Sequence, residues 1–137
     1  MDSDKTITAW IPLQATPLEM GPLEFSAGSH KIIEGRDLAI SDESESFLNK
    51  KLRVSDFMTV VEPFDIGEVS FHSGWVFHRA GANKTDKTRK VMTVIYIDKN
   101  MHLKAPENDG QQKDWDTWCP GTKIGDIIDS PLNPILY

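Results

Sequence analysis

A histidine and an arginine on either side of a polar loop carry the clearest chemistry in this sequence. His78 ends the apolar run Trp75–Phe77, and Arg89 opens a second apolar run beyond the loop. A neutral imidazole is the commonest metal ligand among protein side chains, and a guanidinium binds a carboxylate through two parallel hydrogen bonds. The pair therefore predicts a metal site that also binds a small carboxylic acid.

Both residues also fit ordinary structural roles. A histidine beside apolar residues often packs in a core, and an arginine at the start of a strand often serves as an edge charge. A buried Arg89 needs a negative partner, which a bound acid, Asp65 or Glu68 would supply equally well. His72 is a rival metal ligand, and we favour His78 because only His78 precedes the polar loop and the arginine.

Short apolar segments predict that β-strands build the fold. β-Branched and aromatic residues favour an extended backbone, and prolines and glycines separate the segments. The predicted strands cover residues 6–13, 23–25, 58–62, 69–73 and 89–97, and the apolar run 75–77 is predicted as a further strand that ends at His78. Residues 89–97 are apolar on both faces, so we expect this strand to be covered on both sides.

Two further segments lie outside the predicted strands. Ser41 is a plausible N-cap, and acidic residues followed by basic ones predict a short helical insertion that ends near Leu52. After Asp98 the chain is rich in Pro, Gly, Asn and Asp, and we expect Trp115 and Trp118 to anchor this segment onto the barrel.

Four segments, taken in order, resemble the phytanoyl-CoA dioxygenase family of iron(II)- and 2-oxoglutarate-dependent oxygenases. They are TAWIPLQ at residues 8–14, GPLEFSAGSHK at 21–31, GEVSFHSGWVFHRAGANKTDKTRK at 67–90, and CPGTKIGDIIDSPLNPILY at 119–137. The resemblance spans nearly the whole chain. It implies an all-β fold, a double-stranded β-helix (a cupin-like jelly roll), within one domain over residues 1–137.

The resemblance also implies roles for three residues. His78 would be an iron(II) ligand, and Arg89 would bind the distal carboxylate of the cosubstrate 2-oxoglutarate. Trp10 would form a wall of the cosubstrate pocket. The implied reaction is hydroxylation of a small-molecule substrate, and no side chain of this chain is assigned as a catalytic acid or base.

The sequence departs from the family in its metal ligands. A 2-His-1-carboxylate triad holds the iron in such oxygenases, and the family supplies two of the three ligands from a His-x-Asp motif. No His-x-Asp occurs here, and that motif would fall upstream of Met1; the four histidines are His30, His72, His78 and His102. We therefore expect a jelly roll that is incomplete at its N-terminus, binds iron weakly and turns over little 2-oxoglutarate.

Two other functions remain open from the residues. One is a non-catalytic jelly-roll module that binds a small molecule. The other is a cupin-like binder in which His72 and His78 both hold the metal. The alternation in strand 6–13 also predicts an outward apolar face, which a fragment or a homodimer would explain; its residues are Ile7, Ala9, Ile11 and Leu13.

The composition excludes several classes of partner. The chain has 15 basic and 21 acidic residues, a net charge of −6 and a pI near 5.1, which disfavour nucleic acid and anionic membranes. Its apolar runs are far shorter than the ~20 residues that span a bilayer. Cys119 is the single cysteine, and the first residues do not resemble a signal peptide. We expect a cytoplasmic protein.

Overall fold

The computed structural model describes residues 1–34, 44, 46–48, 50 and 57–136. They form two compact units. The sheet unit is Ile7–Tyr96, and the helix unit combines Met1–Thr6 with Ile97–Tyr137. The helix predicted to follow Ser41 lies mostly outside the described residues, and the assignment of one domain to residues 1–137 stays a prediction.

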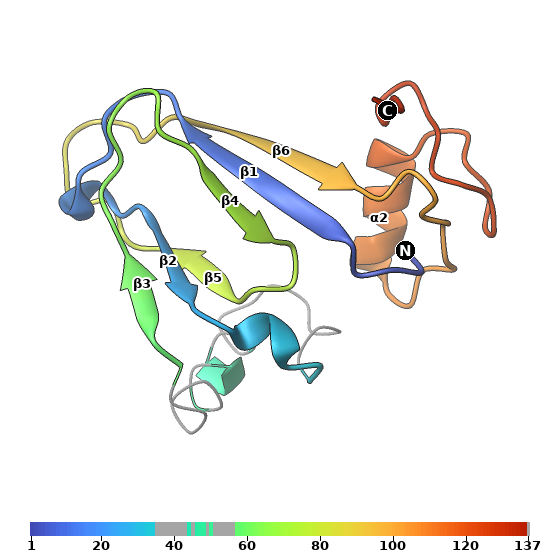
Figure 1. Cartoon of the computed structure of the whole chain (residues 1–137), viewed down its shortest axis with the longest axis horizontal. Coiled ribbons are helices and arrows are strands. Elements are labelled where there is room, and N and C mark those ends of the chain that lie inside the picture. Colours follow the sequence, from blue (N-terminus) through green and yellow to red (C-terminus); the bar gives the residue numbers. More distant parts are fainter. Residues whose placement is uncertain (35–43, 45, 49, 51–56, 137) are drawn as a thin grey trace. The chain divides into compact units, whose positions relative to one another are not determined.

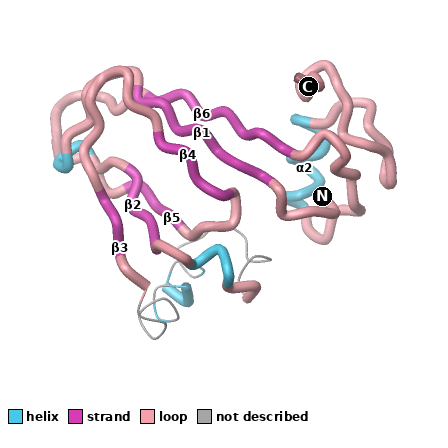
Figure 2. Tube along the Cα trace, in the orientation of Figure 1, coloured by secondary structure: helices cyan, strands magenta, loops and turns pink. Residues whose placement is uncertain are grey.

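Two antiparallel three-stranded sheets form the layers of the sheet unit (Figure 1). The first has the order β4-β1-β6, with β4 at Ser70–Ser73, β1 at Thr6–Pro12 and β6 at Val91–Ile97. The second has the order β3-β2-β5, with β3 at Thr59–Val61, β2 at Leu23–Ser26 and β5 at His78–Ala80. Short 3-10 helices, η1 at Leu18–Met20 and η2 at Ser29–Lys31, flank β2. The predicted all-β architecture is confirmed, and Figure 2 shows that loops make up most of the remaining chain.

Strand register decides which side chains face the space between the two sheets. In the first sheet Thr8 lies opposite His72 and Trp10 lies opposite Ser70. Directly opposed residues share a face, as do residues two apart along one strand. His72 and Trp10 therefore project from the same face, and the His72 ring contacts Phe25 of the second sheet.

A close approach between two backbone segments joins the ends of β2 and β5. Gly21 follows η1 with φ of 69°, in the left-handed region, and a Cβ at this position would lie 2.2 Å from the Gly81 carbonyl oxygen. Only glycine fits here, both for its backbone conformation and for the space available. The contact places the carbonyl groups of Gly21 and Gly81 side by side.

Three strand predictions need correction. Val91, Met92, Ile95 and Tyr96 of β6 are exposed, so the expected cover on both sides is wrong for the described residues. Ala9 is only 2% exposed although it shares the predicted outward face with Ile7, which is 43% exposed.

The third correction concerns Trp75–Phe77, which form a turn and coil before β5 rather than a strand. The Val76 N–H donates to the Ser73 carbonyl, and the Phe77 N–H donates to Ser29 Oγ. His78 consequently begins a strand instead of ending one.

The helix unit has its own small core. It centres on Met101, Leu103 and Ile128, with Trp115 packed against them. Trp115 also donates its Nε1–H to the Thr122 carbonyl at 2.9 Å, so these contacts hold it within the helix unit, and its anchoring onto the barrel stays a prediction. Trp118 is 59% exposed, so its predicted anchoring role is wrong.

Helix α2, Asp109–Trp118, was not expected from the sequence. Its N-cap is Asn108, whose side chain accepts the Gln111 N–H at 2.9 Å, while Gln111 Oε1 accepts the Glu107 N–H. Asn followed three residues later by Gln is a capping-box pattern, which the Asn- and Asp-rich composition of this segment obscured. No helix in the described part of the chain is both long enough and apolar enough to span a bilayer.

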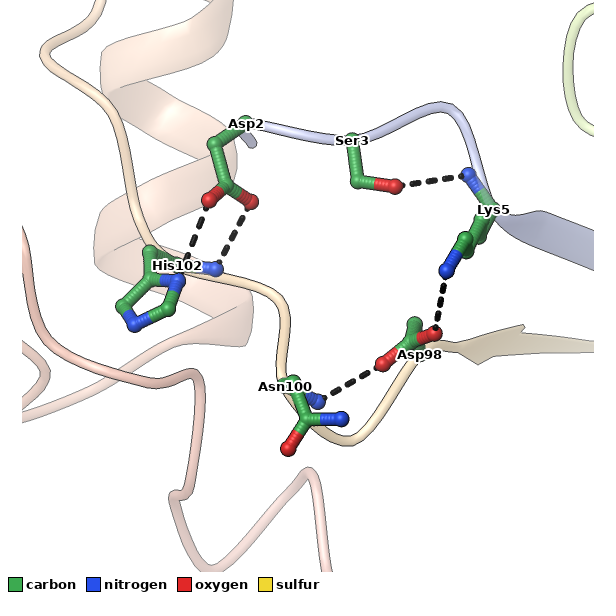
Figure 3. Close-up of polar contacts among 6 residues, drawn as sticks. All are labelled: Asp2, Ser3, Lys5, Asp98, Asn100 and His102. Atoms are coloured by element: carbon green, nitrogen blue, oxygen red, sulfur yellow. Dashed lines mark hydrogen bonds and ion pairs between the residues drawn. The ribbon is translucent and has the colours of Figure 1, made fainter.

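Polar contacts fasten the first residues of the chain within the helix unit (Figure 3). The Asp2 carboxylate accepts the His102 N–H at 2.9 Å and lies 3.0 Å from His102 Nδ1. The backbone hydrogen bond from His102 lowers the pKa of Asp2. Lys5 pairs with Asp98 at 3.4 Å. These exposed pairs position the start of the chain but add little stability.

Candidate functional site

His78 has a fixed ring orientation at the first residue of β5. Its Nδ1 lies 2.9 Å from the Val76 carbonyl oxygen. A carbonyl can only accept, so in the neutral imidazole Nδ1 carries the proton and Nε2 keeps its lone pair. A metal-binding histidine typically shows this arrangement, in which a backbone carbonyl sets the tautomer and the other nitrogen binds the metal.

His72 lies directly beside His78, on a strand of the opposite sheet. The centroids of the two rings are 4.7 Å apart, and the His72 ring is 5.0 Å from that of Phe25. His72 is 8% exposed, and neither ring nitrogen has a hydrogen-bond partner among the described residues. Burial lowers the pKa of His72, and the nearby His78 lowers it further. His72 is therefore neutral at physiological pH.

Trp10 projects from the face of the first sheet that carries His72. It is 6% exposed, and its ring packs against Phe64 with centroids 5.0 Å apart. A large indole in this position keeps water from one side of the interior. The register thus places Trp10 on the predicted inner face, although its contact with a cosubstrate stays a prediction.

Arg89 precedes β6 and reaches the glycine contact at the ends of β2 and β5. Its Nη1 donates to the carbonyls of Met20 at 3.0 Å, Gly81 at 3.1 Å and Gly21. The protein partners of Arg89 are therefore carbonyl oxygens and not Asp65 or Glu68, the carboxylates considered from the sequence.

The remaining donors of Arg89 are available for a ligand. Within the described part of the chain, Nη2 and Nε make no hydrogen bond to protein. Gly81, which Arg89 contacts, follows directly after the strand that His78 begins. The structure thus attaches the predicted carboxylate-binding residue to the strand that carries the predicted metal ligand.

A pocket of about 220 Å³ opens next to the histidine pair. Its lining combines aromatic and aliphatic groups with polar groups, and it contains no Asp, Glu, Lys or Arg: Phe25, His30, Ser70, Phe71, His72, Ser73 and Val76. The pocket lies wholly within the sheet unit.

The described residues do not complete a metal site. No group of three His, Cys, Asp or Glu side chains among them is arranged to hold a metal ion. Iron held by two histidines and a carboxylate needs three ligands. His78 fits as one of the three, and the chain as described does not supply a carboxylate beside it.

The sequence missed the groups that hold Arg89 and the aromatic ring beside the histidines. Every residue has a backbone carbonyl, so the sequence does not show which carbonyl oxygens lie near Arg89. Only the folded backbone shows it. The glycines gave the one available hint, because Gly21 and Gly81 permit a backbone contact that no other residue allows. Phe25 was predicted only as a strand residue.

Comparisons with known proteins support the fold and the family. The family model for phytanoyl-CoA dioxygenase (PhyH) matches residues 1–91. The non-heme alpha ketoglutarate dependent carbocyclase SnoK from nogalamycin biosynthesis is 26% identical, covers 93% of this chain and has a TM-score of 0.67. The epimerase SnoN, in complex with Fe3+, alpha ketoglutarate and nogalamycin RO, is 25% identical over 94% of the chain, with a TM-score of 0.70. No curated protein matches the chain.

The alignment with these structures confirms the predicted cupin-like jelly roll of such oxygenases. The chain spans only about half the length of the structures that it matches, 48% of SnoK and 49% of the SnoN complex.

Proposed function

Since the chain belongs to the phytanoyl-CoA dioxygenase family, we propose that it forms part of an iron(II)- and 2-oxoglutarate-dependent oxygenase that hydroxylates a small molecule. The observation that carries this proposal is the state of His78. Its Nδ1 is engaged by the Val76 carbonyl, which leaves Nε2 available on an exposed ring that lies beside the His72 ring. A solved relative that contains iron and alpha ketoglutarate supports the same cofactors.

Each proposed role follows from a contact of the residue. His78 would hold iron(II) through Nε2, with its ring orientation set by Val76. Arg89 would bind the distal carboxylate of 2-oxoglutarate through Nη2 and Nε, because Nη1 is already engaged. Trp10, whose ring packs against Phe64, would form a wall of the cosubstrate pocket. Bound iron with 2-oxoglutarate supplies the oxygen activation that no side chain can perform.

The remaining two iron ligands would come from a His-x-Asp upstream of Met1. Among the described residues no three-ligand cluster is present, so His78 would need two further ligands to hold iron. We therefore expect the 137-residue chain alone to bind iron weakly and to release little succinate.

The test is succinate release by a polypeptide extended upstream to include a His-x-Asp. It should turn over 2-oxoglutarate, and His78→Ala should reduce the rate to background because a metal ligand is lost. His102→Ala is the matched control, since His102 lies in the helix unit and contacts Asp2; this variant should stay active. Full turnover by His78→Ala would refute the ligand assignment.

A non-catalytic jelly-roll module is the second candidate, and the missing three-ligand cluster favours it. Such a module would bind its small molecule equally well with and without iron. The oxygenase should bind 2-oxoglutarate more tightly when iron(II) is present, because the cosubstrate also contacts the metal. A titration under both conditions distinguishes the two.

We also propose a cytoplasmic location. Cys119 is the single cysteine, so no disulfide within the chain can form. Burial raises the pKa of the Cys119 thiol, which keeps it protonated and unreactive.

A further inference from the structure

The imidazole of His72 contacts its surroundings by packing and not by hydrogen bonds. The residue is 8% exposed, and both ring nitrogens are enclosed and have no hydrogen-bond partner among the described residues. Buried polar groups nearly always have such a partner, and an exception calls for an explanation. Because the nitrogens are enclosed, a ligand cannot provide it, and the explanation must lie in the side chains that the ring touches.

Three rings from the two sheets meet at His72. Its ring centroid lies 5.0 Å from that of Phe25 and 4.7 Å from that of His78, with interplanar angles of 56° and 59°. Phe25 and His78 lie directly opposite each other on β2 and β5, and their centroids are 6.0 Å apart. Tilted contacts at such distances are favourable for aromatic rings. His72 thus completes a three-ring cluster with one member in the first sheet and two in the second.

The three rings differ in how freely they can move. His72 is buried and Phe25 is half-buried, whereas His78 is exposed at the first residue of β5. β5 is only three residues long and lies at an edge of its sheet among the described strands. An exposed side chain ordinarily changes rotamer quickly. Two contacts restrict the His78 ring: the Val76 carbonyl, 2.9 Å from Nδ1, and the packed ring of His72.

We propose that His72 is a positioning residue, which holds the His78 ring in the orientation where Nδ1 donates to Val76 and Nε2 stays free for a metal ion. The inference rests on the proposed function, because it gives His78 the role of an iron ligand. A ligand binds its metal more tightly when neighbouring groups fix its ring and tautomer in advance. In this role His72 does not contact the metal, unlike the cupin-like alternative in which it is a second ligand.

The tautomer of His78 tests this contact without any metal. Long-range proton–nitrogen NMR spectra of the 137-residue chain distinguish the neutral tautomers at about pH 8.5, where an exposed imidazole is uncharged. His78 should carry its proton on Nδ1, whereas a free imidazole prefers the Nε2–H form. His72→Ala removes the packed ring, so the His78 ring can turn away from the Val76 carbonyl. The tautomer ratio should then shift about fivefold toward Nε2–H, which corresponds to one net hydrogen bond of about 1 kcal/mol.

Two further variants separate positioning from a general loss of packing. His72→Phe keeps a planar ring and removes nitrogens that have no partner, so it should keep the wild-type tautomer ratio. Phe64→Ala is the matched control, because it removes an aromatic ring that packs against Trp10 at 5.0 Å in the same unit. This control should destabilise the fold and leave the tautomer of His78 unchanged.

Iron(II) titration of the polypeptide extended upstream tests the consequence for the metal. His72→Ala should weaken iron binding about tenfold, as is typical when a residue that supports a metal ligand is removed, and His72→Phe should not. Either an unchanged tautomer ratio or an unchanged iron affinity in folded His72→Ala would overturn the inference. A folded His72→Phe protein that behaves like His72→Ala would also overturn it, because a packed ring would then not be sufficient.

The two measurements keep this inference apart from the proposed function. If His78→Ala leaves iron binding unchanged while the tautomer of His78 still depends on His72, the oxygenase proposal fails and the contact between the rings stands. If His78→Ala abolishes iron binding while the tautomer does not depend on His72, only the positioning role fails.

Discussion

Arg89 donates from one nitrogen to three carbonyl oxygens, and this arrangement limits what could replace it. The Nη1 bonds fix the guanidinium plane against Met20, Gly21 and Gly81. The other nitrogens then present a flat pair of donors that matches a carboxylate. A lysine ammonium could satisfy the carbonyls or the carboxylate, but it has no second planar edge to serve both.

Arg89→Lys should therefore weaken 2-oxoglutarate binding more than it weakens the fold. We expect a loss of about 10- to 100-fold in affinity, from the roughly 1.5–3 kcal/mol of a hydrogen bond to a charged group. Calorimetric titration measures the affinity, and thermal unfolding monitors the fold.

Arg79→Lys is the matched control for this substitution. Arg79 pairs with Glu24 at 3.0 Å, and both residues project from the face of the second sheet opposite to Phe25 and His78. The control should bind 2-oxoglutarate as the wild type does. Unchanged affinity in Arg89→Lys would exclude Arg89 as the carboxylate clamp.

At the scale of elements, the glycine contact between the ends of β2 and β5 should be the position in the sheet unit that is least tolerant of substitution. Gly21→Ala adds a methyl group 2.2 Å from the Gly81 oxygen and also forces alanine into φ of 69°. The conformational strain costs about 1–2 kcal/mol, and the overlap adds about 1–3 kcal/mol.

Gly67→Ala separates these two contributions. Gly67 has φ of 92°, yet a Cβ there meets nothing within 4 Å. Denaturant unfolding should show the conformational cost alone for Gly67→Ala and a distinctly larger loss for Gly21→Ala. Equal losses would mean that the backbone contact relaxes freely.

The sequence predicted the strands well and the connections between them poorly. β1, β2, β3, β4 and β6 lie within two residues of their predicted bounds, because alternating β-branched and aromatic residues are a local signal. The run Trp75–Phe77 has the same composition but forms a turn. Its conformation depends on hydrogen bonds to Ser73 and to the distant Ser29, and a local pattern cannot reveal the second of these.

The same distinction applies to the candidate site. His78, Arg89 and Trp10 were selected by residue type and by resemblance, and the structure places Trp10 and His72 on one inner face. The contact between the His72 and His78 rings joins two different sheets, so only the folded chain shows it. The exposure of β6 could not be predicted either. An apolar pattern shows that a strand would be more stable when covered, but it does not show whether another element covers it.

At the scale of the whole molecule, the first sheet leaves apolar side chains open to solvent. Ile7 is 43% exposed, Leu13 is 53% exposed, and Ile95 of β6 is 64% exposed. β6 also lies at the edge of its sheet among the described strands, where unpaired backbone groups favour association. A homodimer through the outward apolar face of β1, as predicted from the sequence, would cover Ile7 and Leu13.

Sedimentation velocity should show concentration-dependent self-association of the 137-residue chain. Ile7→Lys should shift the equilibrium toward monomer, because a charge on the apolar face must be desolvated when the face is covered. Ile66→Lys introduces the same charge at a residue that is 73% exposed in a turn, and it should have no effect. If Ile7→Lys leaves the association constant unchanged, this face is not the interface.

The three carbonyl oxygens around Arg89 also have a kinetic consequence. They come from parts of the chain that meet only after folding, so the folded protein holds the guanidinium in place before any diacid arrives. An arriving molecule does not have to wait for a rotamer search or order a flexible side chain. Related diacids should then enter at similar speeds, and their residence times should set which of them occupies the site.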